Sequence, residues 1–194
     1  MKICRFNGNR IGIVRGEGLL DVTDRVAPIL AGQAEGAGDP LLRALPALRA
    51  LGELGDCPVI DDWTGIRLKT AARPTKILAA PVNYRKHVQE MLDAGLAQGH
   101  QLDIAKAGLF VKTVASLAAP ADGIRLRFPE RRTDHEVELV IVIGTGGSDI
   151  AEADALEAVA GYTLGLDITL RGTEDRSLRK SIDSYTVVGP WIVT

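Results

Sequence analysis

Short apolar runs separated by glycine-containing turns open the chain. The runs Ile11 to Val14 and Gly18 to Val22 follow Asn7-Gly8-Asn9 and Gly16-Glu17-Gly18. This pattern predicts a hairpin or small meander over residues 2–22. A further strand is expected between Val59 and Lys69.

A stripe of leucines predicts the first helical region. Six leucines between Leu41 and Leu54 recur at helical spacing, and we interpret them as core. Asp39 and Pro40 precede the stripe and are expected to be the N-cap and the first helical residue. Pro46 lies inside the stripe and should break or kink the helix, because proline lacks the N–H donor that the turn requires.

The segment over residues 132–144 predicts a strand that carries paired acids. A strand's period of two places Glu136 and Glu138 on one face and Val137 and Leu139 on the other. Two carboxylates about 5 Å apart repel by about 3 kcal/mol at an effective dielectric of about 20, and a bound cation would reverse that sign. The run Leu139 to Ile143 is apolar on both faces and predicts a buried strand. The alternative is a strand whose solvent-exposed face carries two glutamates.

A second alternating segment supplies a third carboxylate. In Tyr162 to Thr169 the apolar residues occupy one face, while Asp167 lies on the polar face with Thr163 and Gly165. If this strand lies beside the glutamate strand, three carboxylates converge. Such a set suits a hard cation such as Mg²⁺ or Mn²⁺. Between the two strands, the alanine-rich segment from Ala151 to Ala160 predicts a helix.

A histidine and a glutamate share one face of another predicted helix. Lys76 to Ala80 reads as a strand, and Asn83 is expected to cap a helix from Tyr84 to about residue 94. His87 and Glu90 are three residues apart, so they are neighbours on that helix. A carboxylate beside an imidazole fixes its tautomer and raises its basicity, as in a general base for water. The alternative is a solvated polar pair.

Composition narrows the functional classes. The 194 residues are 46% hydrophobic and 4% aromatic, with a net charge of −2. No basic stripe or stacking platform indicates a nucleic-acid partner, and no apolar run predicts a membrane span. The two cysteines, Cys4 and Cys57, have no metal or redox spacing and read as reduced thiols of a cytoplasmic protein.

Two smaller signals concern strands and domain limits. Leu109 to Lys112 predicts a strand that ends in a lysine, and Ile124 to Phe128 predicts another short strand. Thr70 to Pro74 has small residues and ends in proline, as linkers do. We therefore expect a small α+β domain over residues 1–72 and a second domain over residues 73–194.

Five ordered blocks together resemble the fumarylacetoacetate hydrolase (FAH) family. They run from about Lys76 to Thr194 and are NYRKH with Glu90, FVK, DHEVELVIVIG, GYTLGLDITLR and KSIDSYTVVGPW. The resemblance implies an α+β fold in which the small N-terminal domain precedes a mixed β-roll. Because family members continue past the GPW block, we expect the roll to be incomplete here and the chain to be a fragment or completed by a partner.

The resemblance also implies roles for individual residues. The metal ligands would be Glu136, Glu138 and Asp167, and the dyad that activates water would be His87 and Glu90. Lys180 matches a catalytic lysine that reaches substrate, Arg171 an arginine near the site mouth, and Lys112 a strand lysine that we assign to substrate binding. Leu166, Glu174 and Thr113 depart from the family's usual asparagine, glutamine and proline, and these departures bear on substrate identity.

The activity implied by the resemblance is a Mg²⁺- or Mn²⁺-dependent hydrolysis of a carbon–carbon bond in an acylpyruvate-like 2-oxo acid, as in aromatic catabolism, by a homodimer. Related decarboxylase, hydratase and isomerase chemistries remain open, because all stabilise an enolate. A hypothesis of another class is an inactive, truncated interaction module.

Overall fold

The first part of the chain forms an antiparallel meander followed by helices. The computed structural model describes residues 1–33, 38–51, 54–93, 95 and 103–194. The predicted meander is confirmed, and its strands are β1 (Lys2–Phe6), β2 (Arg10–Arg15) and β3 (Gly18–Asp21). Helix α1 (Thr23–Ala31) follows β3 and packs on β2.

The leucine stripe forms two short helices in place of one. They are α2 (Pro40–Arg43) and α3 (Leu45–Arg49), and Pro46 occupies the first turn of α3. Asp39 is the N-cap of α2, since its side chain accepts a hydrogen bond from the Leu41 amide at 2.9 Å. The predicted break and cap are therefore confirmed, and the leucines join the main hydrophobic core.

The strand expected over Val59 to Lys69 is wrong for most of its length. Only β4 (Val59–Ile60) is a strand, and Leu68 contributes an isolated bridge to Phe6. The physical reason is a turn, in which Asp62 accepts a hydrogen bond from the Thr64 amide at 2.8 Å. Such side-chain capping offers the backbone an alternative to a sheet ladder.

The main sheet joins the beginning of the chain to its last described strand. The strands β9 (Val137–Ile143), β10 (Val159–Asp167) and β12 (Thr186–Val193) complete an order of β4-β3-β2-β1-β12-β10-β9. Strand β1 pairs with β12 through Ile3 and Ile192. Residues on both sides of position 72 thus contribute to one large, mostly antiparallel sheet. The domain division at that position stays a prediction.

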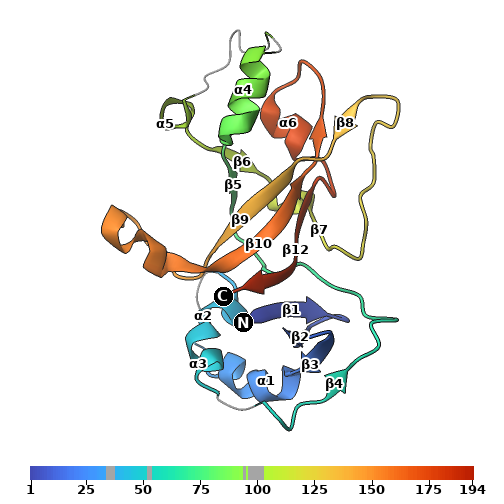
Figure 1. Cartoon of the computed structure of the whole chain (residues 1–194), viewed down its shortest axis with the longest axis vertical. Coiled ribbons are helices and arrows are strands. Elements are labelled where there is room, and N and C mark those ends of the chain that lie inside the picture. Colours follow the sequence, from blue (N-terminus) through green and yellow to red (C-terminus); the bar gives the residue numbers. More distant parts are fainter. Residues whose placement is uncertain (34–37, 52–53, 94, 96–102) are drawn as a thin grey trace.

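Smaller elements gather near one end of this sheet. They include two helices, α4 (Arg85–Asp93) and α6 (Arg176–Lys180), which lie at the same end of the molecule, whereas the meander lies at the other (Figure 1). The remaining elements are β5 (Ile77–Ala79), α5 (Ile104–Ala107), β6 (Phe110–Lys112), the 3₁₀ helix η1 (Val114–Ser116), β7 (Leu117–Ala118), β8 (Thr133–Asp134) and β11 (Thr169–Leu170). The 3₁₀ helix η2 (Glu152–Ala158) connects β9 to β10 at the ends of these strands that lie away from α4 (Figure 1).

These small elements test several predictions. Strands β5 and β6 confirm the expected strands at Lys76 to Ala80 and Leu109 to Lys112, and they pair with each other. Helix α4 begins at Arg85, one residue after the expected start, and residue 94 lies outside the described residues. No helix in the described part of the chain is both long and apolar enough to cross a bilayer.

Two predicted elements are wrong in type. The alanine-rich segment forms η2 instead of an α-helix, and β10 already begins at Val159. Pairing of β10 with β9 therefore overrides the helical propensity of the alanines. Residues 124–128 do not form a strand. Their apolar residues Ile124 and Phe128 instead pack against a hydrophobic cluster that contains Tyr185.

The burial of β9 and β10 differs from the burial that the sequence patterns of these two strands predict. The buried strand expected at Leu139 to Ile143 is wrong, since Leu139, Ile141 and Ile143 are 55–59% exposed on the edge strand β9. On β10 the side chains alternate between two faces as predicted, but the face that bears Asp167 is the buried one. No described element covers the apolar face of β9 that carries Leu139, Ile141 and Ile143.

Candidate metal centre

Antiparallel pairing of β9 and β10 brings three carboxylates together. Glu138 lies opposite Gly165, and the Asp167 amide donates to the Glu136 carbonyl at 2.8 Å. One ligand oxygen from each of Glu136, Glu138 and Asp167 lies within 4.8 Å of the others. The carboxylates therefore converge as the two alternating segments predict.

Two buried lysines neutralise part of this acidic cluster. Lys180, the last residue of α6, donates from Nζ to Glu136 Oε2 at 2.7 Å and to Asp167 Oδ2 at 2.5 Å. Lys112, the last residue of β6, contacts Asp167 Oδ1 and donates to the Tyr185 carbonyl at 3.0 Å. Burial lowers the pKa of Lys112, and the attraction of Asp167 opposes that shift. Asp167 is thus held from both sides by cations.

Glu138, unlike Asp167, has no cation bound to its carboxylate in the described part of the chain. It forms no ion pair with any described residue. Burial raises its pKa, the nearby Asp167 and Glu136 raise it further, and a hydrogen bond from Tyr84 acts in the other direction. A divalent cation at this position would reverse the repulsion and favour the ionised form. Three carboxylates with one of them unpaired are a donor set that fits a hard divalent metal.

Arginines hold the outer side of the cluster. Arg171 donates to Glu136 Oε1 at 2.6 Å and to Asp134 Oδ2 at 2.7 Å. Arg132 donates twice to Asp134 at 2.9 Å. Hydrogen bonds from these two arginines lower the pKa of Asp134 to about 2. Asp134 continues the period-two series of Glu136 and Glu138, which is the sequence signal that could have found it.

The cluster opens into a cavity of about 660 Å³. Among the sequence-predicted site residues, the structure places His87, Glu90, Glu136, Glu138, Asp167, Arg171 and Lys180 in its lining. Lys112 is absent from that lining and lies beneath Asp167, only 2% exposed. The cavity wall also contains Phe110 and Arg176, which the sequence analysis did not select.

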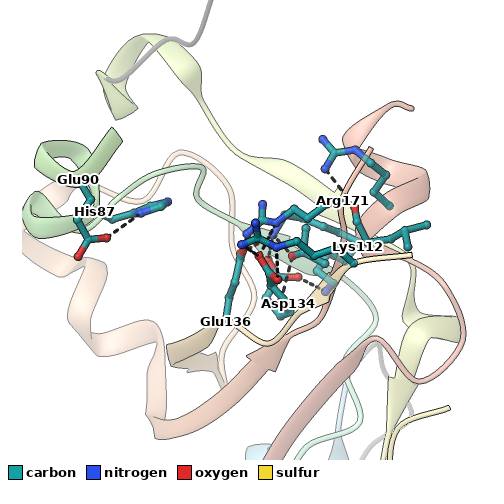
Figure 2. A network of polar contacts seen from close by, with 12 residues as sticks. His87, Glu90, Lys112, Asp134, Glu136 and Arg171 are labelled. Atoms are coloured by element: carbon teal, nitrogen blue, oxygen red, sulfur yellow. Dashed lines mark hydrogen bonds and ion pairs between the residues drawn. The ribbon is translucent and has the colours of Figure 1, made fainter. Parts of the chain in front are cut away.

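Helix α4 carries the histidine and its acid partner. His87 Nδ1 lies 3.6 Å from Glu90 Oε2, and both side chains are at least half exposed. Figure 2 shows the His87 ring pointing from α4 toward the carboxylate cluster, with a gap between them. Tyr84, just before α4, accepts a hydrogen bond from the Leu139 amide at 3.1 Å. This contact ties the start of α4 to β9.

The family assignment follows from comparison with known proteins. Residues 76–194, well over half of the chain, match the family model described as fumarylacetoacetate (FAA) hydrolase C-terminal. The chain belongs to the fumarylacetoacetate hydrolase family. Among curated members of this family, a maleylpyruvate hydrolase from Aquipseudomonas alcaligenes is 46% identical over the whole chain. A putative hydrolase from Burkholderia ambifaria is 33% identical over 91% of it.

Solved structures of the FAH family share the fold. A maleylpyruvate hydrolase from Sphingobium sp. SYK-6, determined in complex with manganese(II) ion and pyruvate, superposes with a TM-score of 0.76 at 32% identity and covers the whole chain. A fumarylacetoacetate hydrolase from Exiguobacterium antarcticum gives 0.71 at 30% identity. The chain spans 70% and 61% of the length of the two curated relatives and 67% and 66% of these two structures.

Proposed function

We propose that this chain carries the catalytic centre of a divalent-metal-dependent hydrolase that cleaves a carbon–carbon bond in an acylpyruvate-like 2-oxo acid. The observation that carries the proposal is one cavity in which Glu136, Glu138 and Asp167 converge while His87 and Glu90 face the same space. The names of the maleylpyruvate hydrolases support the same substrate class.

The metal of this proposal is Mg²⁺ or Mn²⁺, held by Glu136, Glu138 and Asp167. When bound, it would supply a Lewis acid for the 2-oxo acid end of the substrate. Manganese(II) in the Sphingobium structure supports a divalent ion of this kind. Lys112 and Lys180 would hold the Asp167 side chain in the orientation of a ligand, as supporting groups commonly do at metal centres.

The proton chemistry is assigned to α4. His87 Nδ1 faces Glu90, which leaves Nε2 to accept a proton from water. The resulting hydroxide adds to the carbonyl carbon at position 4, and the bond between carbons 3 and 4 then breaks. The electron pair remains on carbon 3 as the enolate of pyruvate, which is protonated on release, while the acyl part leaves as a carboxylic acid. We assign to Lys180, whose Nζ lies at the carboxylate cluster, the stabilisation of the negative charge on the pyruvate oxygen.

Substitution of Glu138 by glutamine tests this assignment. We expect wild-type chain with Mn²⁺ to release pyruvate and a carboxylic acid from an acylpyruvate, and Glu138→Gln to lose about 100-fold or more in kcat/KM, because losing a ligand costs at least as much as losing a supporting group. Calorimetric titration should show weaker Mn²⁺ binding by the same variant. Glu152→Gln, on exposed η2, is the matched control and should match the wild type.

Two results would contradict the proposal. One is a folded wild-type chain that binds Mn²⁺ but cleaves no acylpyruvate. The other is release of CO₂ from oxaloacetate without acylpyruvate cleavage, which would favour the decarboxylase alternative.

We also propose that the functional form is a homodimer. Strand β9 lies at the edge of the sheet and exposes Val137, Leu139, Ile141 and Ile143 on one face, and Leu164 of β10 extends this apolar patch. Contiguous exposed apolar surface of this kind commonly marks an interface between proteins. A second copy of the chain could cover both the edge and the face.

A further inference from the structure

Most cations around the cavity already have partners. Arg132 and Arg171 bind acidic side chains, and Lys180 binds two of the converging carboxylates. Arg179 donates to the carbonyls of Glu174 at 2.7 Å and Leu170 at 3.4 Å. These four side chains therefore serve the cluster or the loop that supports α6.

Arg176 is the exception among the arginines of the cavity wall. It is the first residue of α6 and is half-buried. No described residue offers it a hydrogen-bond acceptor or a carboxylate within ion-pair distance. The adjacent Asp175 is engaged by Ser177, since it accepts from the Ser177 amide at 2.8 Å and contacts the Ser177 hydroxyl. The Arg176 guanidinium therefore has donors available for an anion that enters the cavity.

Phe110 orients this guanidinium. The Arg176 guanidinium carbon lies 5.1 Å from the centroid of the Phe110 ring. This cation–π contact uses no N–H donor in an ion pair, so the guanidinium can still bind a planar anion such as a carboxylate. Arg176 is therefore held in place within the cavity wall without being neutralised.

The same ring gives an upper limit for the distance between Arg176 and Lys180. Lys180 Nζ lies 5.8 Å from the Phe110 centroid and the Arg176 guanidinium carbon 5.1 Å, so the two cations are within about 11 Å of each other. In a seven-carbon diacid the two carboxyl carbons are at most about 8 Å apart, given C–C bonds of about 1.5 Å. Hydrogen bonds at both ends extend that reach by about 3 Å each.

We propose that Arg176 binds the second carboxylate of a dicarboxylic acylpyruvate and thereby selects diacids over monoacids at this site. The inference rests on the proposed function for the position of the 2-oxo acid end, which lies at the carboxylate cluster and Lys180. Arg176 then receives the carboxylate at the far end of the acyl part. Arginine suits this task because its two parallel N–H donors match the two carboxylate oxygens.

The test compares substrates that differ only at the far end. One is a seven-carbon 2,4-dioxo diacid, and the other has a methyl group in place of the far carboxylate. With Arg176→Met we expect kcat/KM for the diacid to fall about 10- to 100-fold, mainly through KM, because a charge-assisted bidentate pair is lost. Turnover of the monoacid should stay within about twofold.

A matched control is available on the surface. Arg127 is exposed and lies 5.8 Å from the Phe128 ring, outside the cavity. Arg127→Met therefore removes the same charge and the same type of ring contact without touching the site. It should leave both substrates unaffected. Equal losses on both substrates in Arg176→Met, or no loss on either, would overturn the proposal.

A binding measurement separates this inference from the hydrolytic function. The 2-oxo acids 2-oxoheptanedioate and 2-oxoheptanoate lack the 4-oxo group, so they cannot be cleaved by the proposed reaction. Calorimetry with Mn²⁺-loaded chain should show that the diacid binds about 10-fold or more tightly than the monoacid, and that Arg176→Met abolishes the difference. That result without turnover of any acylpyruvate would refute the hydrolase and leave the role of Arg176 intact. No preference for the diacid in the wild type would refute the role of Arg176.

Discussion

Lys112 and Lys180 both form ion pairs with Asp167 at the candidate metal centre. Figure 2 shows Lys112 among the polar contacts of this cluster, and its side chain is only 2% exposed. This contact favours a role for Lys112 as a supporting cation of Asp167, and the substrate-binding role that the sequence analysis assigned to it stays a prediction. The two roles predict different consequences of its removal.

We expect Lys112→Met to lower the free energy of unfolding by about 3 kcal/mol, because removing one partner of a buried ion pair leaves the other charge uncompensated. Lys180 also binds Asp167 and limits the loss. Urea unfolding measures the effect, with Lys106→Met as control, since the Lys106–Asp103 pair is exposed and worth about 0.5 kcal/mol or less. Wild-type stability combined with a raised KM would instead support the substrate-binding role.

The residue scale also shows what sequence alone reveals of the site. The carboxylates were found because a strand's period of two is local information that the sequence carries directly. Asp134 could have been found from the same period of two, but its partner Arg171 and the ring beside Arg176 could not, because these contacts come from elsewhere in the chain. Asp134, for example, meets Arg171 at 2.7 Å, and Arg176 meets the ring of Phe110. Such tertiary partners have no signature in spacing.

Strand β10 is the element that positions the site, and its glycines permit its packing. At Gly161 the chain lies against the neighbouring β12, so that a Cβ would contact the Val193 carbonyl oxygen and lie 2.7 Å from Ile192 Cγ2. Asp167 lies at the other end of the same strand. Close approach of β10 to β12 therefore helps fix the carboxylate that β10 presents.

We predict that Gly161→Ala destabilises the protein by about 1–3 kcal/mol or more, since added bulk in a tightly packed sheet forces the backbone to shift. Denaturant unfolding measures this change. Gly146→Ala is the matched control, because nothing lies within 4 Å of its added Cβ. Equal stability of the two variants would show that β10 can move away from β12 at low cost.

Element types were predictable where local pattern and tertiary pairing agree. The meander, the break at Pro46 and the strands β5 and β6 all follow from local signals. The prediction for the alanine-rich segment failed because Val159, near the end of that segment, already pairs with Ile143 of β9. The prediction that β9 is buried was wrong for a related reason. Apolar residues show that a face of a strand can be covered, but they do not show which element covers it.

At the scale of the whole molecule, the proposed homodimer makes a definite prediction. Ile141→Glu places a charge in the middle of the exposed β9 face and should convert a wild-type dimer into monomers, measured by sedimentation equilibrium. Leu126→Glu is the control, because Leu126 is similarly exposed (51% against 55%) but lies in a loop away from β9. A wild-type monomer, or a dimer that survives Ile141→Glu, would contradict the proposal.

The pairing of β1 with β12 has a consequence for biosynthesis. Strand β1 leaves the ribosome before the other described strands, and β2 and β3 can join it at once, but its other neighbour begins only at Thr186. Until then the β1 edge at Ile3 stays open, and β10 and β9 cannot extend the sheet from it. Non-local pairing of this kind slows folding and exposes unpaired edges to other chains. The nascent protein is therefore expected to depend on chaperones that hold an unfinished sheet, and a pause in translation before β12 should increase aggregation.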